Sequence, residues 1–235
     1  MITPSTSPQN SSILQGESNK PPCEYRDLGR VCYRSAFELQ QDLVAQRKEG
    51  AIPDQLLLVE HTSVITLGRN AHSHNVLLPA TDLARCGIEV HASDRGGDVT
   101  YHGPGQIVGY PILDLRYWKR DVVKYLRALE QVMIESVKPL GVRAERLNGC
   151  TGCWVDGAKL GAIGVHISRW VTSHGFALNL SPELKHFDYI VPCGIDKPVT
   201  SVAQLTGKAP DFEKVKMLLV DSFGEIFGRL MVASQ

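Results

Sequence analysis

The chain has 235 residues, 43% of them hydrophobic, which is enough for one sizeable core. Lysine and arginine together number 25, as do aspartate and glutamate, so no net charge attracts the chain to nucleic acid or to a membrane surface. No apolar run could span a bilayer, no secretory signal opens the sequence, and six cysteines with one close pair are typical of reduced thiols, which predicts a cytoplasmic protein.

The first residues are poor in side chains that can be buried. Residues 1–22 are mainly Ser, Pro, Asn and Gln, and we predict a disordered tail. Ordered structure should begin near Cys23 and continue as a single domain over residues 23–232. Its first strand is expected from Tyr25 to Tyr33.

A helix and two strands are predicted next. Ser35 and Glu38 have the spacing of a capping box, which predicts a helix over residues 36–48. Residues 55–61 and 63–68 are candidate strands, and the first is apolar on both faces, as a central strand is.

A polar connection follows these strands. His72 and His74 could begin a zinc site, but no third ligand stands in register with them, so zinc is disfavoured. A helix is expected over Leu77–Cys86 and a short strand over Ile88–Ala92.

The segment from Arg95 to Pro111 has the most unusual composition in the chain. Its glycines alternate with Arg, Asp, Thr, Tyr and His, so it cannot build a core, and it matches neither standard nucleotide-binding loop. It is either a decorated glycine-rich turn or a place where the backbone approaches another molecule closely. If residues 99–102 are extended, Thr100 and His102 share one face, and His102 could point into a cleft.

The clearest helix is predicted from Asp121 to Lys138, with Asp121 as its cap. Basic residues gather around the exposed face of this helix and form either a solvated surface or a docking patch for an acidic partner; they are Arg116, Lys119, Arg120, Lys124 and Arg127.

Cys150 and Cys153 could suggest zinc or redox chemistry, but no second pair is present and the segment is expected to be a turn and a strand.

Asp156 and Gly157 form a hairpin-turn dipeptide, and a strand is predicted after them. Strict alternation would place Lys159 on one face with Gly161, Ile163, Val165 and Ile167. The lysine therefore opens an apolar row. Its ammonium group either reaches water at the strand end or is held partly dry beside a partner, where its proton is easier to remove.

Cys193 lies between Pro192 and Gly194, a setting that suits a thiol presented on a tight loop. The alternative is a buried structural cysteine, as most free thiols are.

The C-terminal part is predicted to be helical. Thr200 or Ser201 can cap a short helix to Leu205, and Asp211 can start a final amphipathic helix.

Together the predicted strands and helices indicate a mixed α/β domain. Its unusual residues fall in three segments, which suggests one site assembled from separated loops and strand ends; the segments are Arg95–Gly105, Gly157–Gly164 and His174–Cys193.

Together these motifs resemble the lipoyl(octanoyl) transferases over roughly residues 25–230. The similarity rests on Arg95-Gly-Gly-Asp-Val-Thr-Tyr-His-Gly-Pro-Gly-Gln106, Gly157-Ala-Lys-Leu-Gly-Ala-Ile-Gly-Val165, His174-Gly-Phe-Ala-Leu-Asn179 and Pro192-Cys-Gly194, in that order. Asp98 departs from the family pattern, in which Gln or Lys is common, and Cys150 and Cys153 are peculiar to this chain.

The resemblance implies the biotin/lipoate protein ligase fold, an α+β arrangement in which helices pack on a mixed, mostly antiparallel sheet. It also implies transfer of an octanoyl group from octanoyl-acyl carrier protein to a lysine of lipoyl domains. These acceptors belong to the E2 subunits of 2-oxoacid dehydrogenases and to the glycine cleavage H protein. No cofactor or metal is implied, and a monomer is expected.

Carried over residue by residue, the resemblance makes Cys193 the residue that holds the acyl thioester and Lys159 the residue that activates it. His102 and His174 could orient the site or supply oxyanion contacts. The residues that match the acyl-binding segments are Arg95, Gly96, Gly97, Asp98, Val99, Thr100, Tyr101, His102, Ala162, Ile163, Gly164, Gly175, Phe176 and Ala177.

Three other functions remain possible. An ATP-dependent lipoate or biotin ligase would share the fold without needing Cys193. A cysteine hydrolase that pairs Cys193 with His174 would release free octanoate. A non-catalytic module that binds acyl carrier protein would not need Lys159.

Overall fold

A computed structural model describes residues 20–191 and 197–234 of the chain. Cys193 and residues 1–19 of the predicted tail lie outside the described residues. The tail was predicted to reach residue 22, but Pro22 already belongs to the first strand.

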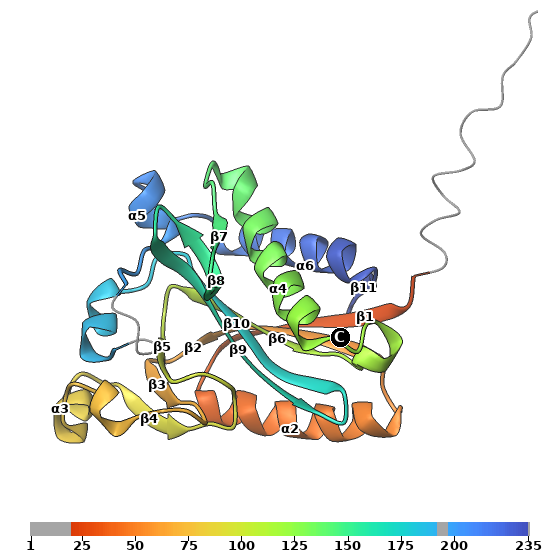
Figure 1. Cartoon of the computed structure of the whole chain (residues 1–235), viewed down its shortest axis with the longest axis horizontal. Helices are drawn as coiled ribbons and strands as arrows, with labels where there is room; N and C mark the ends of the chain where they lie inside the picture. Colours follow the sequence, from red (N-terminus) through yellow and green to blue (C-terminus); the bar gives the residue numbers. More distant parts are fainter. Residues whose placement is uncertain (1–19, 192–196, 235) are drawn as a thin grey trace, which may run out of the picture.

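The centre of the fold is a large twisted sheet (Figure 1). Strands β11, β1 and β2 run parallel to one another, and the remaining pairs are antiparallel, so the predicted mixed, mostly antiparallel sheet is confirmed. In spatial order its strands are β11 (Leu230–Ala233), β1 (Pro22–Val31), β2 (Asp54–His61), β6 (Gln106–Ile112), β10 (Val171–Asn179), β9 (Ala158–Ser168), β8 (Cys150–Val155) and β7 (Glu145–Leu147).

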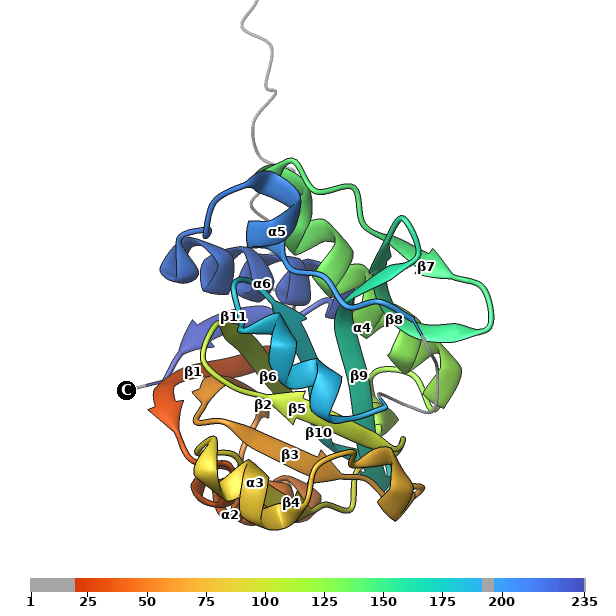
Figure 2. The ribbon, with the colours of Figure 1, turned by 90° about the vertical axis from the view of Figure 1, so that its left-hand side faces the viewer.

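A small sheet lies in front of the large one in Figure 2. Its central strand β3 (Val64–Leu67) pairs with β4 (Glu89–Ala92) in parallel and with β5 (Val99–His102) in antiparallel orientation. The chain passes from the large sheet to the small one between β2 and β3, and it returns between β5 and β6.

Helices cover both faces of the large sheet (Figure 1). Helices α4 (Val122–Val137) and α6 (Phe212–Phe227) pack together on one face and enclose the main apolar core, whereas α2 (Tyr33–Glu49) covers the other. The short elements are α3 (Ala80–Arg85), α5 (Val202–Thr206) and the 3₁₀ turns η1 (Ser73–Asn75), η2 (Leu115–Tyr117), η3 (Lys138–Leu140) and η4 (Leu184–Tyr189).

The sequence placed two helix boundaries wrongly. Helix α2 begins at Tyr33, and the side chain of its N-cap residue Cys32 makes no capping hydrogen bond, so Ser35 and Glu38 do not form the predicted capping box. Helix α3 begins only at Ala80, because the backbone before it is extended and Leu77 donates its N–H to the Tyr189 carbonyl.

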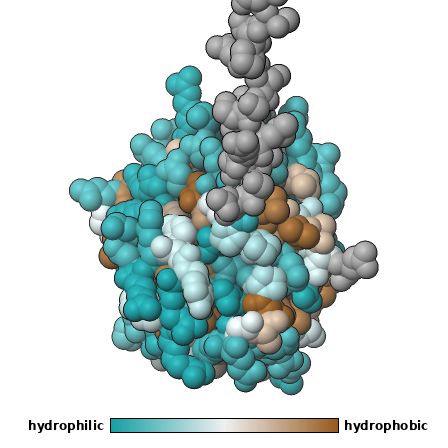
Figure 3. Space-filling model, turned by 90° about the vertical axis from the view of Figure 1, so that its right-hand side faces the viewer, coloured by the Kyte–Doolittle hydropathy of each residue, from teal (hydrophilic) through white to brown (hydrophobic). Residues whose placement is uncertain are grey.

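Hydrophilic residues predominate on the face shown in Figure 3, where the hydrophobic ones form small separate patches. Among the helices that the structure describes, none combines the length and the apolar character needed to cross a bilayer.

Candidate active site

The hairpin between β8 and β9 carries Lys159. Asp156 and Gly157 adopt φ values of 48° and 79°, the left-handed pair that a two-residue turn between twisted strands requires, so the predicted turn is confirmed. This turn pairs Val155 with Ala158 and Trp154 with Lys159.

Just after Lys159 the pairing slips, because Cys153 pairs with Gly161 and leaves Leu160 as an extra residue. Such a bulge re-aims the side chains beside it. Leu160 packs in the core that contains Met133 of α4, and a Cβ at Gly161 would lie 2.6 Å from the Met133 sulfur, so both residues face α4.

Lys159 therefore lies on the opposite face of β9, together with Ala162. The strict alternation predicted from the sequence, with Lys159 beside Gly161 in an apolar row, is wrong. A bulge adds one residue to one strand, and sequence periodicity does not reveal it.

The Lys159 side chain is 8% exposed. Its Nζ lies over the Trp154 ring, 4.8 Å from the ring centroid. Its backbone N–H donates to the Pro198 carbonyl at 2.8 Å, and its carbonyl accepts from the Thr200 N–H at 3.0 Å. No carboxylate in the described part of the chain forms an ion pair with Nζ, so the Trp154 ring faces the ammonium in place of an acidic side chain.

An apolar cavity of about 40 Å³ opens between β9, β10, β6 and β5. It gathers most of the predicted acyl-binding residues, namely Arg95, Gly97, Thr100, His102, Ala162, Ile163, Gly164, Gly175, Phe176 and Ala177, together with His174. The sequence did not indicate Tyr33, Val108 and Tyr110, which complete the wall.

Four predicted acyl-binding residues lie elsewhere. Val99 and Tyr101 point to the other face of β5 and pack in the core of the small sheet, as the period of a strand requires. Asp98 accepts a hydrogen bond from Asn75 Nδ2 at 2.5 Å and so fixes the neighbouring loop. Gly96 lines an outer groove, described next.

Two further cavities meet at Lys159 and Ala162. A narrow inner cavity of about 20 Å³ contains Tyr101 and Asn179. An outer groove of about 310 Å³ passes Gly96, Leu126 and Cys150. Ala162 also lines the apolar cavity, so it borders all three spaces, whereas Lys159 borders the inner cavity and the outer groove.

Arg95 holds the glycine-rich segment against the small sheet. It is 6% exposed, and its guanidinium donates to the Thr66 carbonyl at 2.6 Å and to the Thr66 hydroxyl at 2.9 Å. A Cβ at Gly164 would lie 3.0 Å from the Gly96 carbonyl and 3.1 Å from Arg95 Cδ, so glycine lets β9 approach this segment closely.

His102 donates a hydrogen bond to Gln106 in this site. Gln106 donates from Nε2 to the Tyr101 carbonyl, so its Oε1 accepts from His102 Nδ1 at 3.1 Å. Burial, followed by the charges of His61 and Arg95, lowers the pKa of His102 to about 3. Its Nε2 then carries no proton at neutral pH, which argues against the predicted oxyanion contact, because an oxyanion needs a donor.

His174 forms part of the wall between the apolar cavity and the protein exterior. Its Nε2 contacts Asp94 Oδ1 at 2.6 Å, and its backbone N–H donates to Gln40 Oε1 at 2.9 Å. The hydrogen bond with His174 holds the pKa of Asp94 below its ordinary value. These contacts orient the ring at a residue whose φ is 55°.

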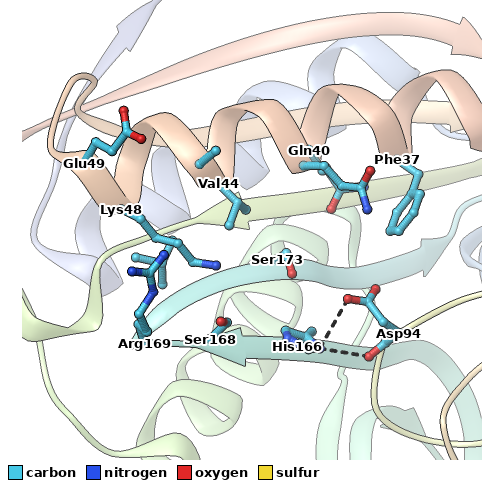
Figure 4. A pocket seen from close by; sticks show the side chains of 13 residues that line it. Phe37, Gln40, Val44, Lys48, Glu49, Asp94, His166, Ser168, Arg169 and Ser173 are labelled. Carbon is cyan, nitrogen blue, oxygen red and sulfur yellow. Dashed lines mark hydrogen bonds and ion pairs between the residues drawn. The ribbon is translucent and has the colours of Figure 1, made fainter.

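A groove of about 390 Å³ lies on the far side of this wall, between α2 and the β9–β10 hairpin (Figure 4). Asp94 at one end is bonded to His166, while Lys48 and Arg169 lie together at the other. None of the predicted site residues lines this groove, so the chemistry is not expected there.

Comparison with known proteins shows the family of this chain. The family described as "Lipoyl protein ligase A/B catalytic domain" matches residues 32–224. A relative from Solibacter usitatus, named Octanoyltransferase, is 56% identical over 87% of this chain and 93% of its own length. Another of that name, from Koribacter versatilis, is 52% identical over 86% of this chain and 82% of its own length.

This chain belongs to the lipoyl protein ligase A/B catalytic domain family. Solved structures show the same fold at low identity. A bi-partite lipoate protein ligase from Thermoplasma acidophilum has a TM-score of 0.70 and 12% identity, covering 92% of this chain and 88% of that one. A biotin protein ligase from Aquifex aeolicus has a TM-score of 0.54 and 13% identity, covering 87% and 70%.

The cysteine pair of this family member is split between two environments. Cys153 is buried in the core, where burial raises the pKa of its thiol to about 12, whereas Cys150 lines the outer groove. Both lie on β8, not at the start of a helix as a redox pair would. Within the described ranges, no group of three His, Cys, Asp or Glu residues is placed to hold a metal.

Sequence reasoning also missed Trp154, the ring beneath Lys159. The turn at Asp156 and Gly157 could have revealed it, because a two-residue hairpin loop places residue 154 directly across from residue 159.

Proposed function

We propose that this chain transfers an octanoyl group from octanoyl-acyl carrier protein to a lysine of lipoyl domains, through a thioester on Cys193. The chain is an acyltransferase, as are its relatives named Octanoyltransferase at 56% and 52% identity. The observation that best supports the mechanism is the buried Lys159, which lines both the inner cavity and the outer groove beside Ala162 of the apolar cavity.

The acceptors we propose are the lipoyl domains of 2-oxoacid dehydrogenase E2 subunits and the glycine cleavage H protein. A structural neighbour, the lipoate protein ligase of T. acidophilum, is described together with its E2 lipoyl domain. The donor we propose is octanoyl-acyl carrier protein, since its thioester is already activated and needs no ATP.

In the first half-reaction, Lys159 in its neutral form takes the proton of the Cys193 thiol. The thiolate attacks the carbonyl carbon of the carrier thioester, and the carrier sulfur leaves with the proton that Lys159 returns. The octanoyl group is then a thioester on Cys193. Pro198, hydrogen-bonded to Lys159, follows Cys193 by only five residues in the chain, which supports this pairing.

In the second half-reaction, the amine of the target lysine attacks the Cys193 thioester. Lys159 removes the proton that the amine loses and returns it to the cysteine sulfur as the sulfur leaves. The products are an amide on the target lysine and the free Cys193 thiol, so the enzyme is ready for another donor.

The apolar cavity is the place that we propose for the octanoyl chain. Burial of the chain stabilises the acyl-enzyme by about 0.8 kcal/mol per methylene. A cavity of about 40 Å³ has room for only a few water molecules, so its wall must move before eight carbons can enter. Phe176 closes it against β6, since a Cβ at Gly109 would lie 2.3 Å from the Phe176 ring.

Intact-mass measurement after mixing with octanoyl-acyl carrier protein tests the proposal. The wild-type chain should gain one octanoyl group, Cys193→Ala none, and Lys159→Ala should gain it at least about a hundredfold more slowly. Two matched controls should behave as wild type, Cys86→Ala at an exposed thiol and Lys138→Ala at an exposed ammonium.

Each rival function predicts a different result. Transfer that requires ATP and free octanoate and survives Cys193→Ala would establish a ligase. Release of free octanoate in the presence of a lipoyl domain would establish a hydrolase. Full function of Lys159→Ala would establish that the chain is a non-catalytic module that binds acyl carrier protein.

A further inference from the structure

We propose that Trp154 is the positioning residue for Lys159, and that its indole face holds the ammonium at the acyl centre. This inference rests on the proposed function, in which Lys159 exchanges a proton with Cys193.

The hairpin fixes the two side chains against each other. Trp154 and Lys159 are directly paired across β8 and β9, two positions from the turn, so their side chains share one face of the sheet. The bulge places Leu160 and Gly161 toward α4 and leaves Lys159 on the Trp154 side. The ammonium then lies 4.8 Å from the ring centroid.

Among the described residues, Trp154 is the one whose ring makes a cation–π contact with Lys159 Nζ. Lys159 is 8% exposed, and a buried charge needs a favourable partner. The titratable residues that line the two spaces around it are Tyr101 and Cys150, and the segment bonded to its backbone offers Pro198, Val199 and Thr200. Tyr101 already contacts His186 Nδ1 at 2.7 Å and Ser63 Oγ at 3.2 Å.

An aromatic face suits proton transfer better than a carboxylate would. A carboxylate would occupy the N–H groups of the ammonium in directional hydrogen bonds. A ring attracts the cation through its quadrupole and leaves the N–H groups of the ammonium free to contact the sulfur of Cys193. The Trp154 ring can thus stabilise the ammonium without engaging its N–H groups in hydrogen bonds.

Hydrogen bonding by the indole nitrogen does not explain why tryptophan occupies this position. Trp154 is fully buried, and its Nε1–H has no hydrogen-bond partner among the described residues. A buried unpaired donor destabilises a fold, so packing alone would favour a residue without it. Tryptophan is the best cation–π partner, which accounts for its presence here.

The test measures alkylation of Cys193 by iodoacetamide as a function of pH, with site-resolved mass spectrometry to separate it from the other cysteines. Without the ring, the ammonium of Lys159 is no longer held in place, so less of the Cys193 thiolate is expected at neutral pH. Trp154→Leu should slow alkylation at pH 7 by roughly ten- to thirtyfold and leave the rate at high pH unchanged. Trp154→Phe, which keeps a weaker ring, should lie between the two.

Tyr125→Leu is the matched control, since Tyr125 is another fully buried aromatic residue, packed in the main core. It should lower thermal stability without moving the pH profile. A wild-type profile for both Trp154 variants, with an altered profile for Lys159→Ala, would overturn this inference alone. An unaltered profile for Lys159→Ala would overturn the role of Lys159 and this inference together.

Discussion

At the scale of single residues, glycines decide how closely β10 approaches β6. A Cβ at Gly175 would lie 2.1 Å from the Gly109 carbonyl oxygen and 2.6 Å from Pro111 Cδ. Both contacts involve backbone or ring atoms that cannot move aside. Gly175 also lines the apolar cavity, so the lack of a side chain there both lets the two strands approach and leaves the cavity open.

We therefore expect Gly175→Ala to lower the free energy of unfolding by about 3 kcal/mol through overpacking, and to slow octanoyl loading. Urea denaturation and intact-mass time courses measure the two effects. Gly141→Ala is the control, because its φ is 80° but nothing lies within 4 Å of its Cβ. It should cost about 1–2 kcal/mol and leave loading unchanged. Normal loading by Gly175→Ala would show that the acyl chain does not occupy this cavity.

At the scale of elements, the helix caps show how far local sequence rules hold. Asp211 Oδ1 accepts from the Lys214 N–H at 3.2 Å, as predicted, and Ser201 Oγ accepts from the Gln204 N–H at 3.2 Å, which decides between the two predicted caps, Thr200 and Ser201. At α2 the same kind of signal fails. Ser35 lies inside the helix and contacts Cys32 Sγ, so its hydroxyl cannot cap the first turn.

Removing a true cap and a false one should therefore have different effects. Asp211→Ala should lower the free energy of unfolding by about 1 kcal/mol, because an N–H of α6 loses its acceptor. Ser35→Ala should change it by less than about 0.5 kcal/mol, as exposed substitutions usually do. Chemical denaturation compares the two, and equal losses would contradict the assignment of the caps.

At the scale of the whole molecule, buried histidines lie where the two sheets meet. His61 of β2 and His102 of β5 have ring centroids 6.0 Å apart. His61 donates from Nδ1 to the Val31 carbonyl and accepts at Nε2 from the Tyr110 hydroxyl at 2.7 Å. Burial lowers the pKa of His61 to about 4 and is the main cause of the pKa of about 3 at His102.

The lowered pKa values predict that the fold weakens in mild acid. As the pH falls through 6.5, the unfolded chain binds protons that the folded chain refuses, so stability is lost from about pH 7 downward. At pH 5 each histidine should cost roughly 2 kcal/mol. Urea titrations at pH 7.5 and 5.0 measure the loss.

His102→Asn should remove about half of this pH dependence, whereas His74→Asn, at an exposed position, should leave it unchanged. Equal stability at the two pH values would contradict burial of neutral histidines at the junction of the sheets.

Local chemistry in the sequence determined much of this protein. It predicted the turn at Asp156 and Gly157, the helices that begin after Asp121 and Asp211, and the alternation that turns Thr100 and His102 away from Val99 and Tyr101. These features follow from steric limits on φ, from hydrogen bonds within one turn and from the period of a strand, all of which neighbouring residues specify. The motifs also carried the family resemblance.

The tertiary structure alone decided how the site is assembled. Tyr33, Val108 and Tyr110 complete the apolar cavity from distant segments, and Asp98 leaves it to bind Asn75. The bulge after Lys159 depends on how Leu160 and Gly161 pack against α4, which no local pattern encodes. Contacts between distant segments have no signature in sequence period, because the free energy that selects them is gained only when the sheets and helices are packed together.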